Sequence, residues 1–498
     1  MTAPHPAPRL EDIAVADLRA RCTTAVASGQ RMQMAYAWFP EATAPELRYV
    51  VHSGTDPLAV WRCRPGSRPV PSLATIAPLL SWYEREITDL CGLSFEGAPD
   101  PAPLVLLPGA EFKTPPLRPG VAPPVTYTPM PPTLPEVSGP VSRDVQTLPF
   151  GPIRADVLES AQFDYYYLGE AIVHYHPQLF FKHRGMEKRF EGQPPDLGVI
   201  LAERVSGVGS VAHALAYTQA VEAAAGCEVP PRARHLRMIL AELERLYNHL
   251  HYLGHLCHTT TLKVGEAEGK YLEERAKQIN GRATGHRLLR GLIGLGGLRR
   301  APDLSGVHAS LQELREELTQ YDSRLEASTT HLDRLITTGI LSRQLAFDQG
   351  ATGPIERASG LDRDLRRDQP YAGYAEMPLK VPTRESGDAH ARQQVRIAEA
   401  HHSIELIQQA TEALPDGPIR SRCVPSANTE GLGWAESPRG SLYYAVHFDA
   451  RGRLARVKIK SPSYSNWRVF AFTVHDSNMM DYAINEASFG LTMAGCDR

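Results

Sequence analysis

Residues 211–250, VAHALAYTQAVEAAAGCEVPPRARHLRMILAELERLYNHL, decide the fold of this chain. The first part has helical character and stops at Gly226, a residue that often ends helices because it adopts the left-handed conformation without strain. Pro230 and Pro231 suit the first turn of a following helix, where a missing N–H costs nothing. One apolar face of that second helix is formed by Leu236, Ile239, Leu240, Leu243, Leu246, Tyr247 and Leu250. The stretch therefore predicts two consecutive helices beside a core.

Other segments extend this pattern in both directions. Further helices are predicted over residues 18–27, 74–91, 266–279, 307–338 and 389–413. Alternating or aromatic-rich segments predict paired strands over residues 32–38 with 47–52, within 163–184, and 442–448 with 454–460. The sequence thus predicts an α+β fold in which a mainly helical core carries small peripheral β-sheets.

Composition divides the chain into three parts. Residues 1–97 are predicted to form a small α/β domain, and residues 151–498 the mainly helical domain. Between them, residues 98–150 include PDPAPLVLLPG, KTPPLRPGVAPPV and PMPPTLPEV. Proline lacks a backbone donor and fixes φ, so this segment is predicted to be an extended linker that lies along a neighbouring surface.

Charge and cysteine usage narrow the class of protein. The 498 residues are 42% hydrophobic and 22% charged, which are globular values, and the net charge of -3 argues against nucleic-acid binding. No run of eighteen apolar residues occurs, so no bilayer crossing is expected, and the first residues lack the pattern of a secretory signal. Seven scattered cysteines fit a reducing compartment. A cytoplasmic, multi-domain protein is expected.

Three groups of motifs carry a resemblance to a known family. The first group is YEREITDLCGLSFEG at residues 83–97 with Pro116-Leu-Arg118. The second group comprises Gly151-Pro-Ile, Leu168-Gly-Glu170, HRGMEK at 183–188, ERVSGVG at 203–209 and AYTQAVE at 216–222. The third comprises GPIERASG at 353–360, Pro370-Tyr371, ESPRG at 436–440, VKIKSPS at 457–463 and Asp497-Arg498. Together they resemble the large subunits of NiFe hydrogenases and complex I over nearly all of residues 80–498. The first group is similar to the complex I subunit that is often fused to the large subunit in hydrogenases of the formate hydrogenlyase type.

The resemblance implies a nickel–iron centre held by two C-x-x-C pairs, and this chain departs from that pattern. The early pair falls on Ser206 and Gly209, and the late pair falls on Thr492 and Gly495. A hydroxyl is a poor ligand for a soft metal, and glycine offers no side chain. Cys496 lies one position beyond the late pair. We therefore expect the NiFe ligands to be lost and no cofactor to be bound by this chain itself.

The quinone-reducing version of the family is also incomplete here. The resemblance implies a histidine in the loop that begins at Gly151, and that loop has Arg154 in the first place and no histidine. The position of the implied tyrosine falls on Gly207. The remaining charged family positions are Arg439, which matches an arginine above the metal centre, and Glu170, His183 and Glu187. They are candidates for a proton relay or cavity lining, or alternatively they orient the fold and contact a neighbouring subunit.

Two hypotheses about function follow. In the first, the chain is the large subunit of a membrane-bound, formate-hydrogenlyase-like or complex-I-like oxidoreductase. A small partner subunit with a 4Fe-4S cluster would supply electrons for quinone or another acceptor, and membrane-arm subunits would hold the assembly at the cytoplasmic face of the membrane. In the second, the chain is a non-catalytic scaffold of such a complex. An active NiFe hydrogenase with atypical ligands is a further alternative.

Two other patterns have simpler explanations. His251 and His255 are i, i+4 neighbours near His258, a spacing that suits zinc, whereas His249 matches a structural family position. The glycines of LIGLGG at 292–297 follow a helix and lack the Lys-Ser/Thr of a phosphate loop, so a turn is predicted there.

Overall fold

The computed structural model describes residues 8–498 except 53, 67, 107–111, 113, 123–143, 155–158 and 476. The first element group is a sheet whose strands lie in the order β1-β4-β3-β2, with β1 parallel to β4 and the other neighbours antiparallel. Its strands are β1 (Arg9–Asp12), β2 (Arg31–Glu41), β3 (Ala44–His52) and β4 (Ala59–Cys63). Helices α1 (Leu18–Ala27) and α2 (Ser81–Cys91) lie beside it, with the short pair β5 (Val70–Pro71) and β6 (Phe95–Glu96).

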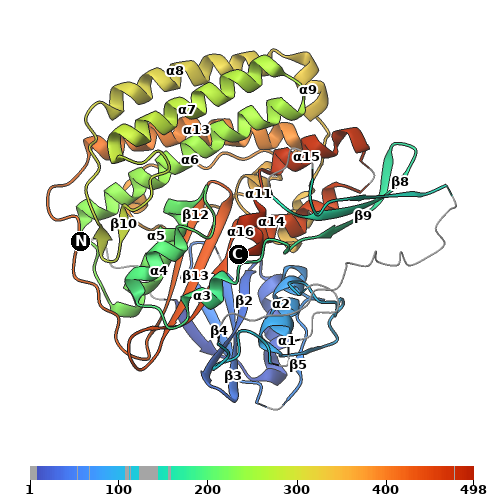
Figure 1. The fold of residues 1–498 in the computed structure, drawn as a ribbon, viewed down its shortest axis with the longest axis vertical. Helices are drawn as coiled ribbons and strands as arrows, with labels where there is room; N and C mark the ends of the chain where they lie inside the picture. The colour runs from blue at the N-terminus through green and yellow to red at the C-terminus, as the bar shows by residue number, and fades with distance from the viewer. Residues whose placement is uncertain are drawn as a thin grey trace.

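A second sheet lies at the centre of the molecule (Figure 1). It is antiparallel and consists of β12 (Glu430–Ser437), β13 (Gly440–Phe448) and β14 (Leu454–Lys460). Helix α5 (Ser210–Ala225) packs on β12 so closely that only glycine fits at two strand positions, Gly431 and Gly433. Because β13 is buried along its whole length, the central sheet belongs to the core between the N-terminal sheet and the helices.

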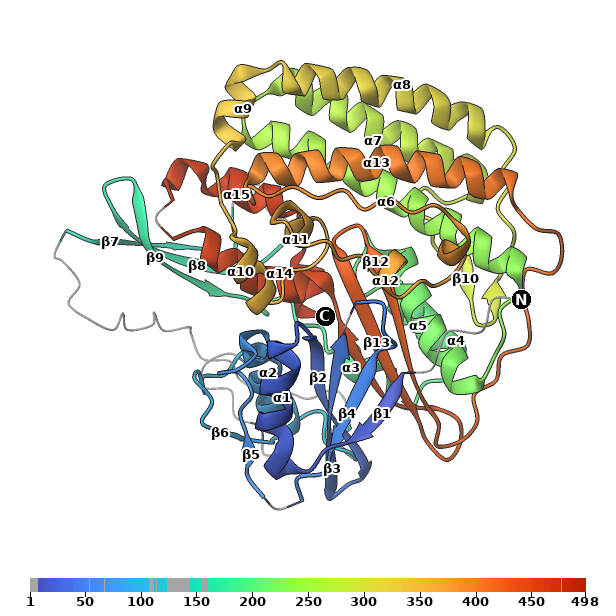
Figure 2. The same ribbon diagram turned by 180° about the vertical axis from the view of Figure 1, so that it is seen from behind.

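Long helices form the layer farthest from the N-terminal sheet (Figures 1 and 2). They are α6 (Pro231–Thr259), α7 (Lys263–Thr284), α8 (Val307–Glu326) and α13 (Ala389–Glu412). Helix α6 is buried over most of its length, and its buried residues include charged ones such as Arg237, Glu242 and Arg245, which must find partners inside the protein.

A third sheet and the short helices complete the fold. Strands β7 (Gln146–Phe150), β8 (Gln162–Leu168) and β9 (Ala171–Gln178) form an antiparallel sheet that extends from the body in Figure 1. The short pair is β10 (Ile293–Gly294) with β11 (Gly297–Leu298). The shorter α-helices are α3 (Met186–Phe190), α4 (Pro195–Ala202), α9 (Thr329–Leu335), α10 (Arg343–Asp348), α11 (Pro354–Ala358), α12 (Leu365–Asp368), α14 (Pro462–Phe470), α15 (Tyr482–Phe489) and α16 (Met493–Asp497). The 3-10 turns are η1 (Val15–Asp17), η2 (Pro78–Leu80), η3 (Tyr374–Glu376), η4 (Ala471–Thr473) and η5 (Met479–Asp481).

The predicted α+β class is confirmed, and the two helices of the opening stretch are present as α5 and α6. Two predicted helices were wrong in extent. The segment 74–91 becomes helical only from residue 78, because Ala77 precedes a proline and has non-helical backbone angles. The segment 307–338 is interrupted by Ser328, whose backbone is extended, so it forms two helices. Strand β12 was not predicted.

About half of the proline-rich segment at 98–150 lies outside the described residues, and its last five residues form strand β7 and not an irregular linker. Its described part contacts α2, because Arg85 donates hydrogen bonds to the carbonyls of Ala102 and Pro103. The carboxylate of Asp89 accepts from the backbone N–H groups of residues 104–106. The predicted division of the chain into domains at residues 97 and 150 stays a prediction. Within the described ranges, no helix combines the length and apolarity that a bilayer crossing requires.

The contact between α5 and β12 allows a direct test. Substitution Gly433→Ala places a Cβ against the carbonyl oxygen of Ala216 and the N of Ala220, both in helix backbone that cannot move alone. We expect the free energy of unfolding to fall by about 1–3 kcal/mol, or more, as for other overpacked cores. Urea denaturation measures it. Gly281→Ala is the control, since a Cβ at that helical position meets open space. Its free energy of unfolding should rise by about 0.5–1 kcal/mol. An unchanged Gly433→Ala variant would contradict the close packing.

Candidate functional site

The two segments that correspond to the early and late ligand pairs meet in the structure. Arg184, just ahead of α3, ties them together with its guanidinium. It donates to the carbonyl oxygens of Arg204 at 2.9 Å and Val205 at 2.6 Å in the loop before α5. It also donates to the carbonyl oxygen of Ala494 in α16 at 2.9 Å. Sequence reasoning passed over Arg184, although it lies inside the HRGMEK motif.

Arg439 makes a second bridge between the same segments. It stands in the turn between β12 and β13 and donates from Nε to the carbonyl of Gly490 at 2.7 Å. Its Nη1 donates to Oδ1 of Asn248 at 2.8 Å, and Asn248 in turn donates to the carbonyl of Val208 at 2.8 Å. Burial lowers the pKa of Arg439 to about 10, which still leaves it charged at neutral pH. Arg439 therefore joins the segment before α16 to α6, and its predicted position above a metal centre stays a prediction.

The four residues at which the sequence predicts the ligand positions do not fit a thiolate-bound metal. Ser206 is buried, and Gly209 faces the imidazole of His213. Thr492 caps α16, because its hydroxyl accepts from the backbone N–H of Gly495 at 3.2 Å. A Cβ at position 495 would stand 2.7 Å from that hydroxyl oxygen. The late pair thus serves to form a helix end, and the hydroxyls and glycines present supply none of the soft donors that nickel needs.

Two carboxylates that the sequence did not single out hold the backbone around these positions. Glu159 accepts from the N–H groups of Met493 at 2.5 Å and Ala494 at 3.0 Å, at the N-terminus of α16. Glu244 accepts from Val211 at 2.7 Å and Ala212 at 2.9 Å, at the N-terminus of α5. Burial raises the pKa of Glu244 to about 7. The sequence signal that could have pointed to Glu244 is its place directly after Leu243, which belongs to the predicted apolar face of α6.

The candidate relay residues are only partly brought together. His183 and Glu187 both line a cavity of about 960 Å³, together with Arg184. Nδ1 of His183 lies 2.6 Å from the carbonyl oxygen of Asp497, while the residue as a whole is exposed. Glu170 is exposed at the β8–β9 turn, where it accepts a hydrogen bond from Asn478. Neither Glu170 nor Arg439 lines this cavity.

Glu187 is an ion-pair partner inside the core. Its carboxylate lies 2.8 Å from Arg456, 3.2 Å from Lys458 and 3.0 Å from Arg498. Burial alone would raise the pKa of Glu187, but Lys458, Arg456 and Arg498 together hold it well below its usual range. Lys458 and Arg498 also pair with Glu86 of α2, so this cluster joins the N-terminal sheet unit to β14. These contacts favour the interpretation that Glu187 orients the fold.

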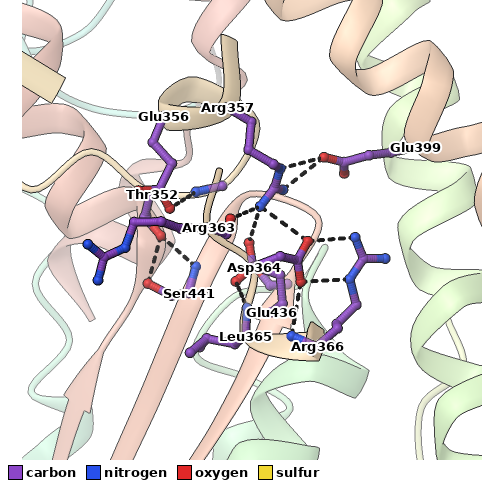
Figure 3. Close-up of polar contacts among 12 residues, drawn as sticks. Thr352, Glu356, Arg357, Arg363, Asp364, Leu365, Arg366, Glu399, Glu436 and Ser441 are labelled. Carbon is purple, nitrogen blue, oxygen red and sulfur yellow. Dashed lines mark hydrogen bonds and ion pairs between the residues drawn. The ribbon is translucent and has the colours of Figure 1, made fainter. Parts of the chain in front are cut away.

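A second buried charge network surrounds α11 and α12 (Figure 3). Arg357 is fully buried and pairs with Glu399 at 2.8 Å, Asp364 at 3.2 Å and Glu436 at 3.0 Å. Arg366 continues the network from Asp364 at 2.7 Å to Glu242 of α6 at 3.1 Å. The neighbouring Glu356 pairs with Arg31 of β2 at 3.0 Å. The GPIERASG motif therefore contributes to both connections with the central and N-terminal sheets.

The histidine cluster on α6 has no metal-like arrangement. The rings of His251 and His255 stack with centroids 6.3 Å apart, and His255 stacks on His258 at 6.2 Å. His249 lies in the core and hydrogen-bonds to Glu399 at 2.9 Å. Among the residues that the structure describes, no group of three or more His, Cys, Asp or Glu side chains is able to hold a metal ion. The glycines at 292–297 form the β10–β11 turn, as predicted.

Comparisons with known protein families match most of this chain. The profile described as "Respiratory-chain NADH dehydrogenase, 49 Kd subunit" matches residues 271–430 and 420–498. The profile "Respiratory-chain NADH dehydrogenase, 30 Kd subunit" matches residues 14–124, and "Nickel-dependent hydrogenase" matches residues 184–281. The fold and the paired segments thus define a large subunit of the hydrogenase and complex I type.

Similar whole proteins narrow the class. Formate hydrogenlyase subunit 5 of Escherichia coli is 32% identical over 425 residues, covering 82% of this chain and 74% of that protein. A fused C/D subunit of NADH-quinone oxidoreductase from Rhodopseudomonas palustris is 28% identical over 585 residues, covering 97% and 99%. A chain in the structure of the archaeal membrane-bound sulfane sulfur reductase matches with a TM-score of 0.68 and 25% identity, covering 72% of this chain and all of that one. This chain belongs to the family of formate hydrogenlyase large subunits and fused complex I C/D subunits, which confirms the resemblance found in the sequence.

Proposed function

We propose that this chain is the large subunit of a membrane-associated oxidoreductase complex and passes electrons from a small iron–sulfur subunit to quinone or another acceptor. The observation that carries the proposal is the junction of the two ligand segments. Arg184 and Arg439 hold these segments together although Ser206 and Thr492 occupy thiolate positions. A junction that is held together without soft metal ligands suits electron transfer through a partner better than hydrogen chemistry. The names of the relatives, which include NADH-quinone oxidoreductase and a respiratory membrane complex, support this class.

The face formed by α3 and α4 is the proposed position of the small subunit. The large cavity there combines basic side chains, Arg184, Lys188 and Arg189, with the apolar side chains of Leu197 and Leu201. Leu197 is 39% exposed and Ile200 of the same helix is 40% exposed. An apolar patch within a charged rim is typical of a protein interface. We propose that the 4Fe-4S cluster of the partner approaches His183 here, and that membrane-arm subunits attach the complex peripherally to the cytoplasmic side of the membrane.

Nickel content tests the loss of the metal centre. For the complex purified from membranes, we expect far less than one nickel per chain by inductively coupled plasma mass spectrometry, because two hydroxyls and two glycines cannot replace four thiolates. Iron measured in the same sample is the control, since an iron–sulfur partner supplies it independently. Stoichiometric nickel would instead establish an active NiFe hydrogenase with atypical ligands.

Activity of Arg439 variants tests whether the junction is catalytic. In Arg439→Ala the two bridging hydrogen bonds to Gly490 and Asn248 disappear, and we expect quinone reduction by membranes to fall about 100-fold because the reacting groups lose their alignment. Arg439→Lys should recover little, since an ammonium cannot reproduce the forked geometry. The surface variant Arg367→Ala is the matched control, because its side chain is 36% exposed. Assembly of each variant is followed by co-purification of partner subunits.

The second candidate is a scaffold that has lost catalysis. It is favoured by Thr492, whose hydroxyl now caps a helix, and by Gly495, which has no room for a thiol beside it. Under this alternative, Arg439→Ala and the unsubstituted complex show equal activity, or neither shows any, while the complex remains assembled. That result would exclude the catalytic proposal without affecting the proposed interface.

A further inference from the structure

Two of the seven cysteines differ from the others in exposure. Cys227 and Cys423 are partly exposed, whereas the remaining five, Cys22, Cys63, Cys91, Cys257 and Cys496, are buried. Cys227 follows the end of α5 and Cys423 lies in the loop that leads to β12. Although they are far apart in sequence, the two surface loops lie against each other.

The contacts between these loops place the Cys227 thiol against the two residues that precede Cys423. Sγ of Cys227 lies 3.4 Å from the hydroxyl of Ser421 and donates to the carbonyl of Arg422 at 3.6 Å. The hydroxyl of Ser421 donates back to the carbonyl of Glu228 at 2.7 Å, which holds the loops in register. Because Arg422 directly precedes Cys423, the contact with the carbonyl of Arg422 places the Cys227 thiol next to the backbone that carries Cys423. The flanking residues Glu228 and Arg422 are exposed, so a small molecule has access.

We propose that Cys227 and Cys423 form a reversible disulfide when a low-molecular-weight disulfide oxidises them. The Cys227 thiolate attacks one sulfur of the oxidant, the S–S bond of the oxidant breaks, and one thiolate leaves. Cys423 then loses its proton and attacks Sγ of Cys227, which releases the second half of the oxidant as a thiol. The protein loses two protons and two electrons, and the oxidant is reduced to two thiols.

The environments of the two thiols assign their roles. Burial, followed by the neighbouring Cys227, raises the pKa of Cys423, so Cys423 is a poor first nucleophile and acts as the resolving thiol. The disulfide would fix the C-terminal end of α5 to the loop before β12, and α5 begins next to Gly209. It would thus clamp the helix that carries the early ligand segment.

Oxidised glutathione tests the proposal on the complete purified chain, with alkylation and peptide mass mapping. The unsubstituted protein is expected to lose two hydrogens and to yield one peptide pair linked through Cys227 and Cys423, and dithiothreitol should reverse the change. Cys423→Ser should stop at one glutathionyl group on Cys227. Cys227→Ser should react at least tenfold more slowly, because only the poorer nucleophile remains.

Cys22→Ser is the control, since this thiol is fully buried and should leave the linked pair unchanged. Three results would overturn the proposal. The first is a stable mixed disulfide on Cys227 in the unsubstituted protein. The second is full reaction of both thiols with the alkylating reagent after treatment with the oxidant. The third is a disulfide that links two molecules.

Discussion

Replacing Arg357 with leucine is expected to lower the free energy of unfolding by about 3–5 kcal/mol, the usual cost of leaving buried charges without their partner. The guanidinium is fully buried and pairs with Glu399, Asp364 and Glu436, at 2.8, 3.2 and 3.0 Å. Without it, three carboxylates would remain in a region that water does not reach. Chemical denaturation followed by tryptophan fluorescence measures the change.

Arg367→Ala is the matched control for this prediction. Arg367 is also an arginine in ion pairs, with Asp362 and Asp368, but its side chain is 36% exposed. The exposed pair with Asp362 contributes about 1 kcal/mol or less. The buried Asp368 keeps its hydrogen bond from the N–H of Asp364, so the control should lose much less than Arg357→Leu. If Arg357→Leu behaved like the control, the network in Figure 3 would not contribute to stability in this way.

Glu187→Gln is expected to have an effect of similar size, about 3–5 kcal/mol at pH 7. The substitution keeps the shape of the side chain and removes the negative charge that Arg456, Lys458 and Arg498 share. These three cations would then face one another inside the core, compensated by Glu86 alone within the cluster. Because Glu86 lies in α2, loosening of the N-terminal sheet unit should accompany the loss.

The pH dependence separates charge from packing in this variant. The cations lower the pKa of Glu187 below its ordinary value of 4.5, despite the opposing effect of burial. Its contribution is therefore fully present above pH 4.5 and is lost as the pH falls through the folded-state pKa. The difference between Glu187→Gln and the unsubstituted protein should narrow below pH 4.5. A constant difference from pH 7 to pH 3 would indicate packing, and Glu170→Gln, at an exposed position, is the control.

Much of the fold followed from local patterns. Helix α1 has the predicted bounds, and α5 and α6 begin and end close to the glycine and prolines that signalled them. Strand β12 escaped prediction because its sequence, EGLGWAES, alternates poorly and contains two glycines. Those glycines allow β12 to pack against α5, whose residues lie more than two hundred positions earlier in the sequence. Packing of that kind leaves no periodic signal.

The site was predicted in part. The motifs identified the family, whereas the ligand segments and the role of Arg439, which donates to the carbonyl of Gly490, stay predictions. The sequence did not single out Arg184, Glu159 and Glu244. Their side chains form hydrogen bonds with backbone groups that are distant in the sequence, and such contacts leave no local pattern. The role of His183, Glu187 and Glu170 in proton transfer stays a prediction, and the ion pairs of Glu187 point to a structural role.

The sequence by itself determined that this chain is a hydrogenase and complex I type large subunit, and it predicts hydroxyls and glycines at the thiolate positions. Ligand identity is a matter of side-chain chemistry at fixed motif positions, and such chemistry can be read from residues alone. Only the tertiary structure decided that Thr492 caps a helix and that Arg184 and Arg439 hold the two segments together. Partners such as Arg357 and Glu436 lie 79 residues apart, and no local pattern selects between them before the chain has folded.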